Sequence, residues 1–223
     1  MRFLNRPVLA GLLACAALIT VTAPARAATP TEQDSVALHQ AVAHLPLAPE
    51  DRTGYNRATS FGGWIDADRD GCNTRQEVLL DEAVTPPTIT GKCTLTGGTW
   101  DSWYDDTTVD GPSTLDIDHL VPLAEAWDSG ASQWTKARRV AYANYLGDAR
   151  HLVAATARSN RSKSDQDPAT WMPPAADATC RYTADWISVK LTWGLAVDPA
   201  EHDALAEFAA NCPDQDITYT PTD

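Results

Sequence analysis

The segment from Leu115 to Val121 constrains the fold more than any other part of the sequence, because it is a short strand-like run that carries ionisable side chains. Asp116 and Asp118 are two residues apart, so both would point to one face of a strand. His119 follows at once, and Pro122 ends the strand because proline has no backbone N–H to donate. The strand therefore delivers a carboxylate and an imidazole side by side.

The stretch from Ser159 to Ser164 supplies complementary groups, since the amide of Asn160 lies beside the cations Arg161 and Lys163. A carboxylate and an amide oxygen can hold a hard divalent ion such as Mg²⁺. An imidazole next to that ion can take a proton from water, and cationic side chains can hold a phosphate. These groups predict metal-assisted hydrolysis of a phosphodiester.

The predicted order from 115 to 164 is a strand, a long helical connection, a short strand over 151–155 and a helix over 156–162. With Asp118-His119-Leu120-Val121-Pro122 and Asn160-Arg161-Ser162-Lys163, it resembles the HNH, or ββα-metal, nuclease family. Within that family it is similar to the C-terminal domain of GmrSD-type restriction endonucleases. The resemblance implies an α+β fold: a ββα-metal (HNH) core with a β-hairpin and additional packed helices, stapled by disulfides.

The resemblance also implies roles for individual residues. His119 matches the general base of the family, and Asp118 and Asn160 match its metal ligands. Lys163, with Arg161 or Arg158, would offset the charge of the pentacoordinate state.

Two further positions keep alternative roles. Asp116 is either another metal carboxylate or a residue that orients a ligand. Nine places before Asn160, where the family usually has a structural Asn, this chain has His151, and either His151 or Asp148 would position the catalytic loop.

The N-terminus reads as a secretory signal, with Arg2 and Arg6 before an apolar run and a small-x-small cleavage site at Ala25-Arg26-Ala27. We predict a signal peptide over 1–27, an N-terminal segment over 28–50, a nuclease domain over 51–212 with its motif core at 115–164, and a tail over 213–223. The protein is expected to be secreted and free of the membrane after cleavage; a retained signal anchor is the alternative.

Four cysteines remain once Cys15 leaves with the signal: Cys72, Cys93, Cys180 and Cys212. An even number in an exported chain indicates two disulfides, for which three pairings exist. Proximity in sequence favours Cys72–Cys93 and Cys180–Cys212. A zinc site is disfavoured, because no pair has the close spacing that such sites use.

An aspartate-rich loop matches several positions of an EF-hand calcium loop, through Asp66, Asp68, Asp70 and Glu77. Cys72 and Asn73 depart from that pattern. The same segment has a second interpretation, in which Arg75 on the following helix faces the nuclease site as a phosphate clamp. The segment therefore has two alternative functions: a second cation site, which would bind Ca²⁺, or a phosphate contact through Arg75.

The formal charge is −13, and loss of the three Arg of the signal brings it to −16. Such a chain does not coat nucleic acid by charge alone, but it can act through a metal and a local basic patch. We expect a monomer that cuts DNA rather than RNA with little sequence preference, using Mg²⁺ or, alternatively, Mn²⁺. The competing hypothesis is a non-catalytic calcium-binding exported module.

Hydrophobic periodicity and turn residues predict the remaining elements. One hairpin is expected over 88–104, with its turn at Gly97-Gly98, and is followed by a polar loop over 105–112. The expected helices span 36–45, 74–82, 123–128, 134–146, 178–193 and 199–210.

Overall fold

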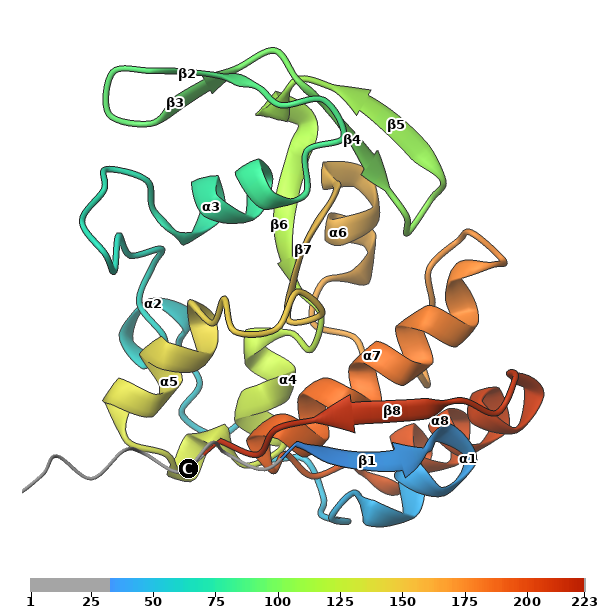
Figure 1. Ribbon diagram of the computed structural model, residues 1–223. Coiled ribbons are helices and arrows are strands. Elements are labelled where there is room, and N and C mark those ends of the chain that lie inside the picture. Colours follow the sequence, from blue (N-terminus) through green and yellow to red (C-terminus); the bar gives the residue numbers. More distant parts are fainter. Residues whose placement is uncertain (1–32, 223) are drawn as a thin grey trace, which may run out of the picture. The chain divides into compact units, whose positions relative to one another are not determined.

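The computed structural model describes residues 33–222, within which eight strands pair two by two into four antiparallel sheets (Figure 1). These residues belong to the unit formed by Thr31–Asp223. The predicted signal peptide lies outside the described residues. Across 33–222, no helix combines the length and the apolar character needed to cross a membrane. The chain is thus a mixed α+β protein with small sheets.

Strand β6 (Leu115–His119) pairs antiparallel with β7 (Leu152–Thr156), and α6 (Ala157–Lys163) follows β7 directly. Asp118 is opposite Val153 in this pair. The side chain of Thr156 starts α6 by accepting a hydrogen bond from the backbone N–H of Ser159, the usual device of a helix N-cap. Both motif segments of the sequence are therefore brought together in a strand–strand–helix unit.

The connection between β6 and β7 is helical, as expected. It contains α4 (Leu123–Asp128), the 3₁₀ turn η3 (Ala131–Gln133) and α5 (Lys136–Ala143). Two longer helices follow α6, namely α7 (Ala178–Trp193) and α8 (Pro199–Asn211). Asp198 caps α8 by accepting from the backbone N–H groups of Ala200 and Glu201.

Two disulfides are present, and their pairing is the one that proximity in sequence favours. Cys180–Cys212 joins the first turn of α7 to the residue after α8. Cys72–Cys93 joins the loop before α3 (Thr74–Asp81) to the turn between β2 and β3. One bond therefore links the last two helices of the chain segment 178–211, and the other links the loop before α3 to the β2–β3 hairpin.

The prediction for residues 88–112 was wrong, because this stretch forms two hairpins. Strand β2 (Thr88–Thr90) pairs with β3 (Thr94–Thr96), and β4 (Thr99–Ser102) pairs with β5 (Thr107–Asp110). Of these strands, β5 lies within the predicted polar loop. Gly98 lies between the hairpins. A Cβ at Gly98 would stand 2.8 Å from the ring of Trp100 and 2.9 Å from the carbonyl of Thr85. Glycine at this position therefore allows the backbone to pass close to Trp100 and Thr85, where a larger side chain would not fit.

The helix predicted over 36–45 is shorter than expected. Residues Asp34–Ala37 form β1, which pairs with β8 (Asp216–Tyr219), and only α1 (Leu38–Ala41) and the 3₁₀ turn η1 (Val42–His44) are helical. The partner of β1 lies at the far end of the chain, in the predicted tail. Tertiary pairing therefore outweighs the local helical pattern.

Two groups of buried apolar side chains flank the β6–β7 pair. The larger one gathers residues of α1, α4, α5, α7 and α8, and includes Leu120, Tyr142, Trp186 and Trp193. The smaller one joins α3 to the strands, and includes Leu79, Trp100, Ile117 and Leu152. The remaining short elements are α2 (Arg57–Ser60) and the 3₁₀ turn η2 (Pro112–Thr114).

Candidate active site

A pocket of about 460 Å³ opens where β6 ends, and both motif segments contribute to its wall. Asp118 and His119 come from β6, and Asn160 and Arg161 come from α6. A second cavity, of about 500 Å³, lies between α3 and residues 145–152 and contains no residue of either motif segment. The smaller pocket is therefore the candidate site.

The imidazole of His119 is held in one orientation. Its Nε2 atom lies 2.9 Å from the carbonyl oxygen of Ala143, and its ring stacks on Trp64 with centroids 5.1 Å apart and planes at 4°. Because a carbonyl only accepts, Nε2 carries the proton and Nδ1 has a free lone pair. Burial lowers the pKa of His119 well below its ordinary value. The ring is therefore neutral and offers Nδ1 as a base.

The carboxylate of Asp118 is buried, and one of its oxygens is fully used. Oδ2 accepts hydrogen bonds from Lys163 Nζ and from the hydroxyl of Tyr104, each at 2.6 Å. Burial raises the pKa of Asp118, while the ammonium of Lys163 opposes that shift. Among residues 33–222, no donor is bonded to Oδ1. Asp118 therefore has one oxygen left for a cation.

The predicted contact between Lys163 and phosphate is contradicted by its burial. The side chain is 0% exposed, and Nζ donates to Asp118 and, at 2.9 Å, to the carbonyl of His119. These two bonds tie α6 to the end of β6. Lys163 therefore positions the residues of the pocket instead of facing it.

Asp116 orients the neighbouring amide. Its Oδ2 accepts from Asn160 Nδ2 and from Arg161 Nε, both at 3.2 Å. With Nδ2 committed to a carboxylate, Asn160 presents its amide oxygen on the other side. Asp116 is not part of the pocket wall. Of the two roles left open for Asp116, its contacts favour orientation of Asn160.

His151 lies behind the pocket instead of lining it. It is 1% exposed, its Nε2 lies 2.7 Å from the carbonyl of Tyr142, and burial lowers its pKa to about 4. The carbonyl of His151 accepts from the backbone N–H of Leu120 at 3.0 Å. Both histidines therefore bind consecutive carbonyls at the end of α5. Asp148 caps the same loop and forms an ion pair with Arg150.

The contacts of Arg75 do not support the alternative in which it faces the nuclease site. Its Nη2 atom donates to the carbonyls of Leu115, at 2.9 Å, and Pro112, at 3.3 Å, at the start of β6. That position is four residues before His119, or roughly 13 Å along a strand. Arg75 therefore supports the backbone of β6 at the opposite end from the pocket.

A different cation, Arg57, lines the pocket and was missed by sequence reasoning. It is exposed at the start of α2, and it also contributes to an adjoining pocket of about 80 Å³ shared with Trp64 and His119. The positive charge of Arg57 contributes to the lowered pKa of His119. Arg57 belongs to neither motif, and only the path of the chain before α2 brings it to the site.

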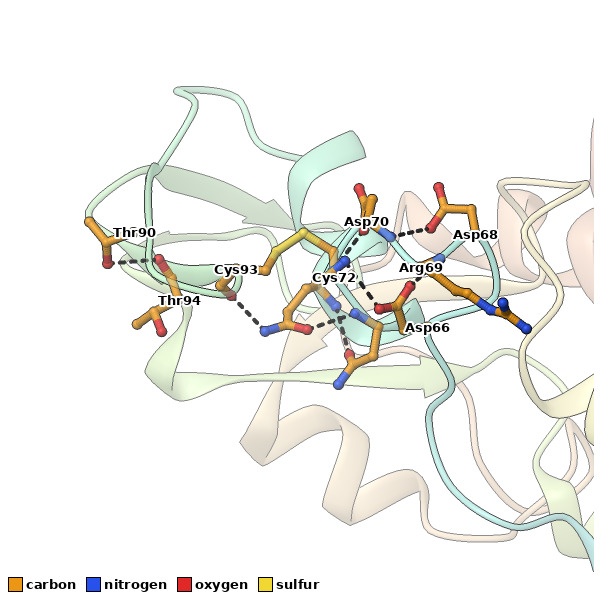
Figure 2. The surroundings of a disulfide bond; sticks show 11 residues. Asp66, Asp68, Arg69, Asp70, Cys72, Thr90, Cys93 and Thr94 are labelled. Atoms are coloured by element: carbon orange, nitrogen blue, oxygen red, sulfur yellow. Dashed lines mark hydrogen bonds between the residues drawn. A yellow bond between two sulfur atoms is a disulfide. The ribbon is translucent and has the colours of Figure 1, made fainter.

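The aspartate-rich loop forms an acidic group beside the Cys72–Cys93 disulfide (Figure 2). Ligand oxygens of Asp66, Asp68 and Asp70 all lie within 4.8 Å of one another. Each carboxylate also accepts from a loop N–H, including those of Arg69, Asp70 and Cys72. Glu77 is not a member of this group, although burial and the three aspartates raise its pKa. Calcium binding here stays a prediction.

Comparisons with known proteins place both motif segments in one family. The family described as "GmrSD restriction endonucleases, C-terminal domain" matches residues 80–208, which is more than half of the chain. An "Uncharacterized secreted protein" from Arthroderma benhamiae is 38% identical over 205 residues, covering 90% of this chain and 98% of its own length. No solved structure matches the chain. The chain therefore belongs to the family of GmrSD restriction endonuclease C-terminal domains.

Proposed function

We propose that the protein is a secreted, metal-dependent endonuclease that hydrolyses phosphodiester bonds in nucleic acid. One observation carries the proposal: a neutral His119 shares a pocket with Asp118 and Asn160, and within residues 33–222 His119 Nδ1 and one oxygen of each of the other two side chains have no hydrogen-bond partner. The description of the family as restriction endonucleases supports nuclease chemistry. The two disulfides, and the description of the fungal relative as secreted, support export.

In the proposed enzyme, the β6–β7–α6 unit is the ββα-metal (HNH) core of a nuclease domain over 51–212. The free oxygens of Asp118 and Asn160 fit a hard divalent cation, because such ions take carboxylate and amide oxygens. Mg²⁺, or alternatively Mn²⁺, would polarise the phosphoryl group and stabilise the leaving oxygen. Lys163 keeps Asp118 ionised for this role without touching substrate.

The residues of the chain supply the proton transfer and hold the phosphate. His119 Nδ1 takes a proton from the attacking water, while Nε2–H stays bound to the carbonyl of Ala143 and fixes the ring. Arg161, whose side chain is 74% exposed, and Arg57 provide positive charge at the pocket wall. That charge offsets the extra negative charge of the pentacoordinate state.

The proposed substrate is DNA, cut with little sequence preference by a monomer. A formal charge of −13 disfavours broad contact with the backbone, so binding would depend on the cations at the pocket. We expect DNA to be cleaved faster than RNA of equal length.

The test is cleavage of supercoiled plasmid by the purified mature protein. We expect nicking with Mg²⁺, its loss with EDTA, and a decrease of roughly 10²–10⁴-fold in His119→Ala. Asn160→Ala should raise the Mg²⁺ concentration needed for half-maximal cleavage. Of the two arginines considered for charge compensation, Arg161 lines the candidate site and Arg158 borders a different pocket. Arg158→Ala is therefore the control for Asn160→Ala, which lies on the same helix.

Two results would contradict the proposal. Mg²⁺-dependent nicking that is unchanged in His119→Ala would remove the proposed base. Inactivity of the wild type on DNA and RNA with Mg²⁺, Mn²⁺ and Ca²⁺ alike would favour the competing function, a calcium-binding module. The acidic group of Asp66, Asp68 and Asp70 supports that alternative function. A calcium-binding module would bind Ca²⁺ in His119→Ala as well as in wild type.

A further inference from the structure

A second group of carboxylates gathers around Glu50, and none of its members lines the candidate active site. Glu50 belongs to two triads, one with Glu125 and Asp128 and one with Asp167 and Asp198. Within each triad, the ligand oxygens all lie within 4.8 Å of one another. The five residues come from the loop before α2, from α4, from the loop after α6 and from the N-cap of α8. Four separate segments thus converge on one acidic centre.

One oxygen in this centre is buried without a partner. Asp128 is 6% exposed, and its Oδ2 accepts from Arg52 Nε at 2.6 Å. Its Oδ1 is buried and has no hydrogen-bond partner in the described part of the chain. A buried anionic oxygen without a donor is unfavourable, so Asp128 offers Oδ1 to a ligand. Glu125 is 1% exposed; its Oε1 accepts from Ser129 and Lys190, and its carboxyl group also shares a hydrogen bond with that of Glu50.

The cationic side chains nearby do not neutralise the group. Arg52 is shared between Asp128 and Asp165, with 2.6 Å to each. Lys190 is shared between Glu125, at 2.7 Å, and Glu201, at 2.6 Å. Burial and the neighbouring Glu125 raise the pKa of Glu50 to about 7. The carboxylates therefore outnumber the positive charges that contact them.

We propose that the carboxylates around Glu50 form a structural binding site for a divalent cation, with Ca²⁺ preferred over Mg²⁺. Ca²⁺ binds six to eight oxygens at about 2.3–2.6 Å, so two ligands of one ion are separated by at most about 4.6–5.2 Å. The spacing within 4.8 Å falls inside that limit. Mg²⁺ usually keeps several waters and binds through one or two carboxylates, whereas Ca²⁺ takes many oxygen ligands in a flexible geometry, so a group of five carboxylates favours Ca²⁺.

The bound ion would connect the loop that carries Glu50 to α4 and α8. The same loop leads to Tyr55 and Arg57, which line the candidate active site. Arg52 in this loop also reaches Asp165 on the pocket wall. The bound ion would therefore hold one wall of the pocket in place. Occupancy of the cation site can be measured without any assay of cleavage.

The test is thermal unfolding and calorimetric titration of the EDTA-treated, dialysed mature protein with CaCl₂. At a free Ca²⁺ concentration about 100 times Kd, linkage predicts a rise in Tm of roughly 5–10 °C. Glu50→Gln should lose most of that rise. Asp68→Asn, in the other acidic loop, should keep it and serves as the matched control. Without Ca²⁺, Glu50→Gln should unfold at the same temperature as wild type or higher, because the amide removes a repelling charge.

Several outcomes would overturn the proposal. A full Ca²⁺-dependent rise in Tm in Glu50→Gln, together with its loss in Asp68→Asn, would place the ion in the aspartate-rich loop. The absence of both binding heat and a shift in Tm for wild type at millimolar Ca²⁺ would exclude any such site. An equal rise in Tm with Mg²⁺ would refute the preference for Ca²⁺. Asp128→Asn, which removes the charge of the unpartnered oxygen, should lose the Ca²⁺-dependent rise in Tm as Glu50→Gln does, and a full rise in this variant would also contradict the proposal.

Discussion

Replacing Lys163 by Met should destabilise the protein by about 3–5 kcal/mol at pH 8, which is the usual cost of removing one partner of a buried ion pair. The side chain is 0% exposed and lies 2.6 Å from Asp118, which is itself 5% exposed. Met has a similar volume, so the loss comes from the uncompensated carboxylate more than from a cavity. Among the described residues, the hydroxyl of Tyr104 is the one donor that would remain for that carboxylate.

The cost should depend on pH with a definite sign. Burial raises the pKa of Asp118 in the folded protein, and loss of Lys163 would raise it further. A carboxyl with a raised folded pKa contributes stability that is present below its unfolded pKa and lost as the pH rises through its folded pKa. The deficit of Lys163→Met should therefore be smallest near pH 4. It should grow by up to about 1.4 kcal/mol per pH unit until Asp118 ionises.

Urea unfolding of both proteins between pH 4 and pH 8 measures the deficit. Arg161→Met is the matched control, because Arg161 lies on the same helix with a side chain 74% exposed and pairs with Asp116 at 3.2 Å. That exposed pair should contribute less than about 1 kcal/mol. A deficit for Lys163→Met below about 1 kcal/mol, or one independent of pH, would refute the reasoning.

Three further outcomes are expected. Burial raises the pKa of Glu82 to about 7, so wild type loses stability as the pH rises from 4.5 to 7. In urea unfolding, Glu82→Gln should therefore be more stable than wild type by roughly 2 kcal/mol at pH 8 and show no gain at pH 4. Replacing Cys72 and Cys93 by Ser opens a crosslink of 21 residues and should cost about 3 kcal/mol by the same measurement, and a cost near zero would contradict the entropic argument. Arg57→Ala should raise the KM for plasmid roughly tenfold and leave Tm unchanged, whereas an unchanged KM would remove Arg57 from the phosphate site.

Sequence patterns predicted the elements whose signals are local. The bounds of α4 and α7 were predicted as they are observed, because apolar residues recur at helical spacing between clear ends such as Pro122 and Gly194. The two hairpins within 88–110 were not predicted, since Gly98 permits a close approach to Trp100 and does not form a hairpin turn. The strand β1 was missed because its partner lies at the other end of the chain.

The candidate site was predicted in part for related reasons. The order of Asp118, His119 and Asn160 in two separated motifs was enough to predict that these residues share a pocket, and they do. The burial of Lys163 could not be predicted, because a cation at the end of a short polar helix resembles a solvated residue until the fold brings it to Asp118 and to the carbonyl of His119. Arg57 carries no motif, so only the fold brings it to the pocket.

The pairing of β1 with β8 makes the described chain nearly circular, with Val36 opposite Ile217. Thr222 also contacts α5, since its carbonyl accepts from Arg138 Nη2 at 2.9 Å. A short linker between the two ends, with new termini opened at the exposed turn of the β2–β3 hairpin, would therefore give a circular permutant that retains both motif segments. For a nascent chain this pairing sets an order of events, because β1 stays unpaired until β8 has been synthesised.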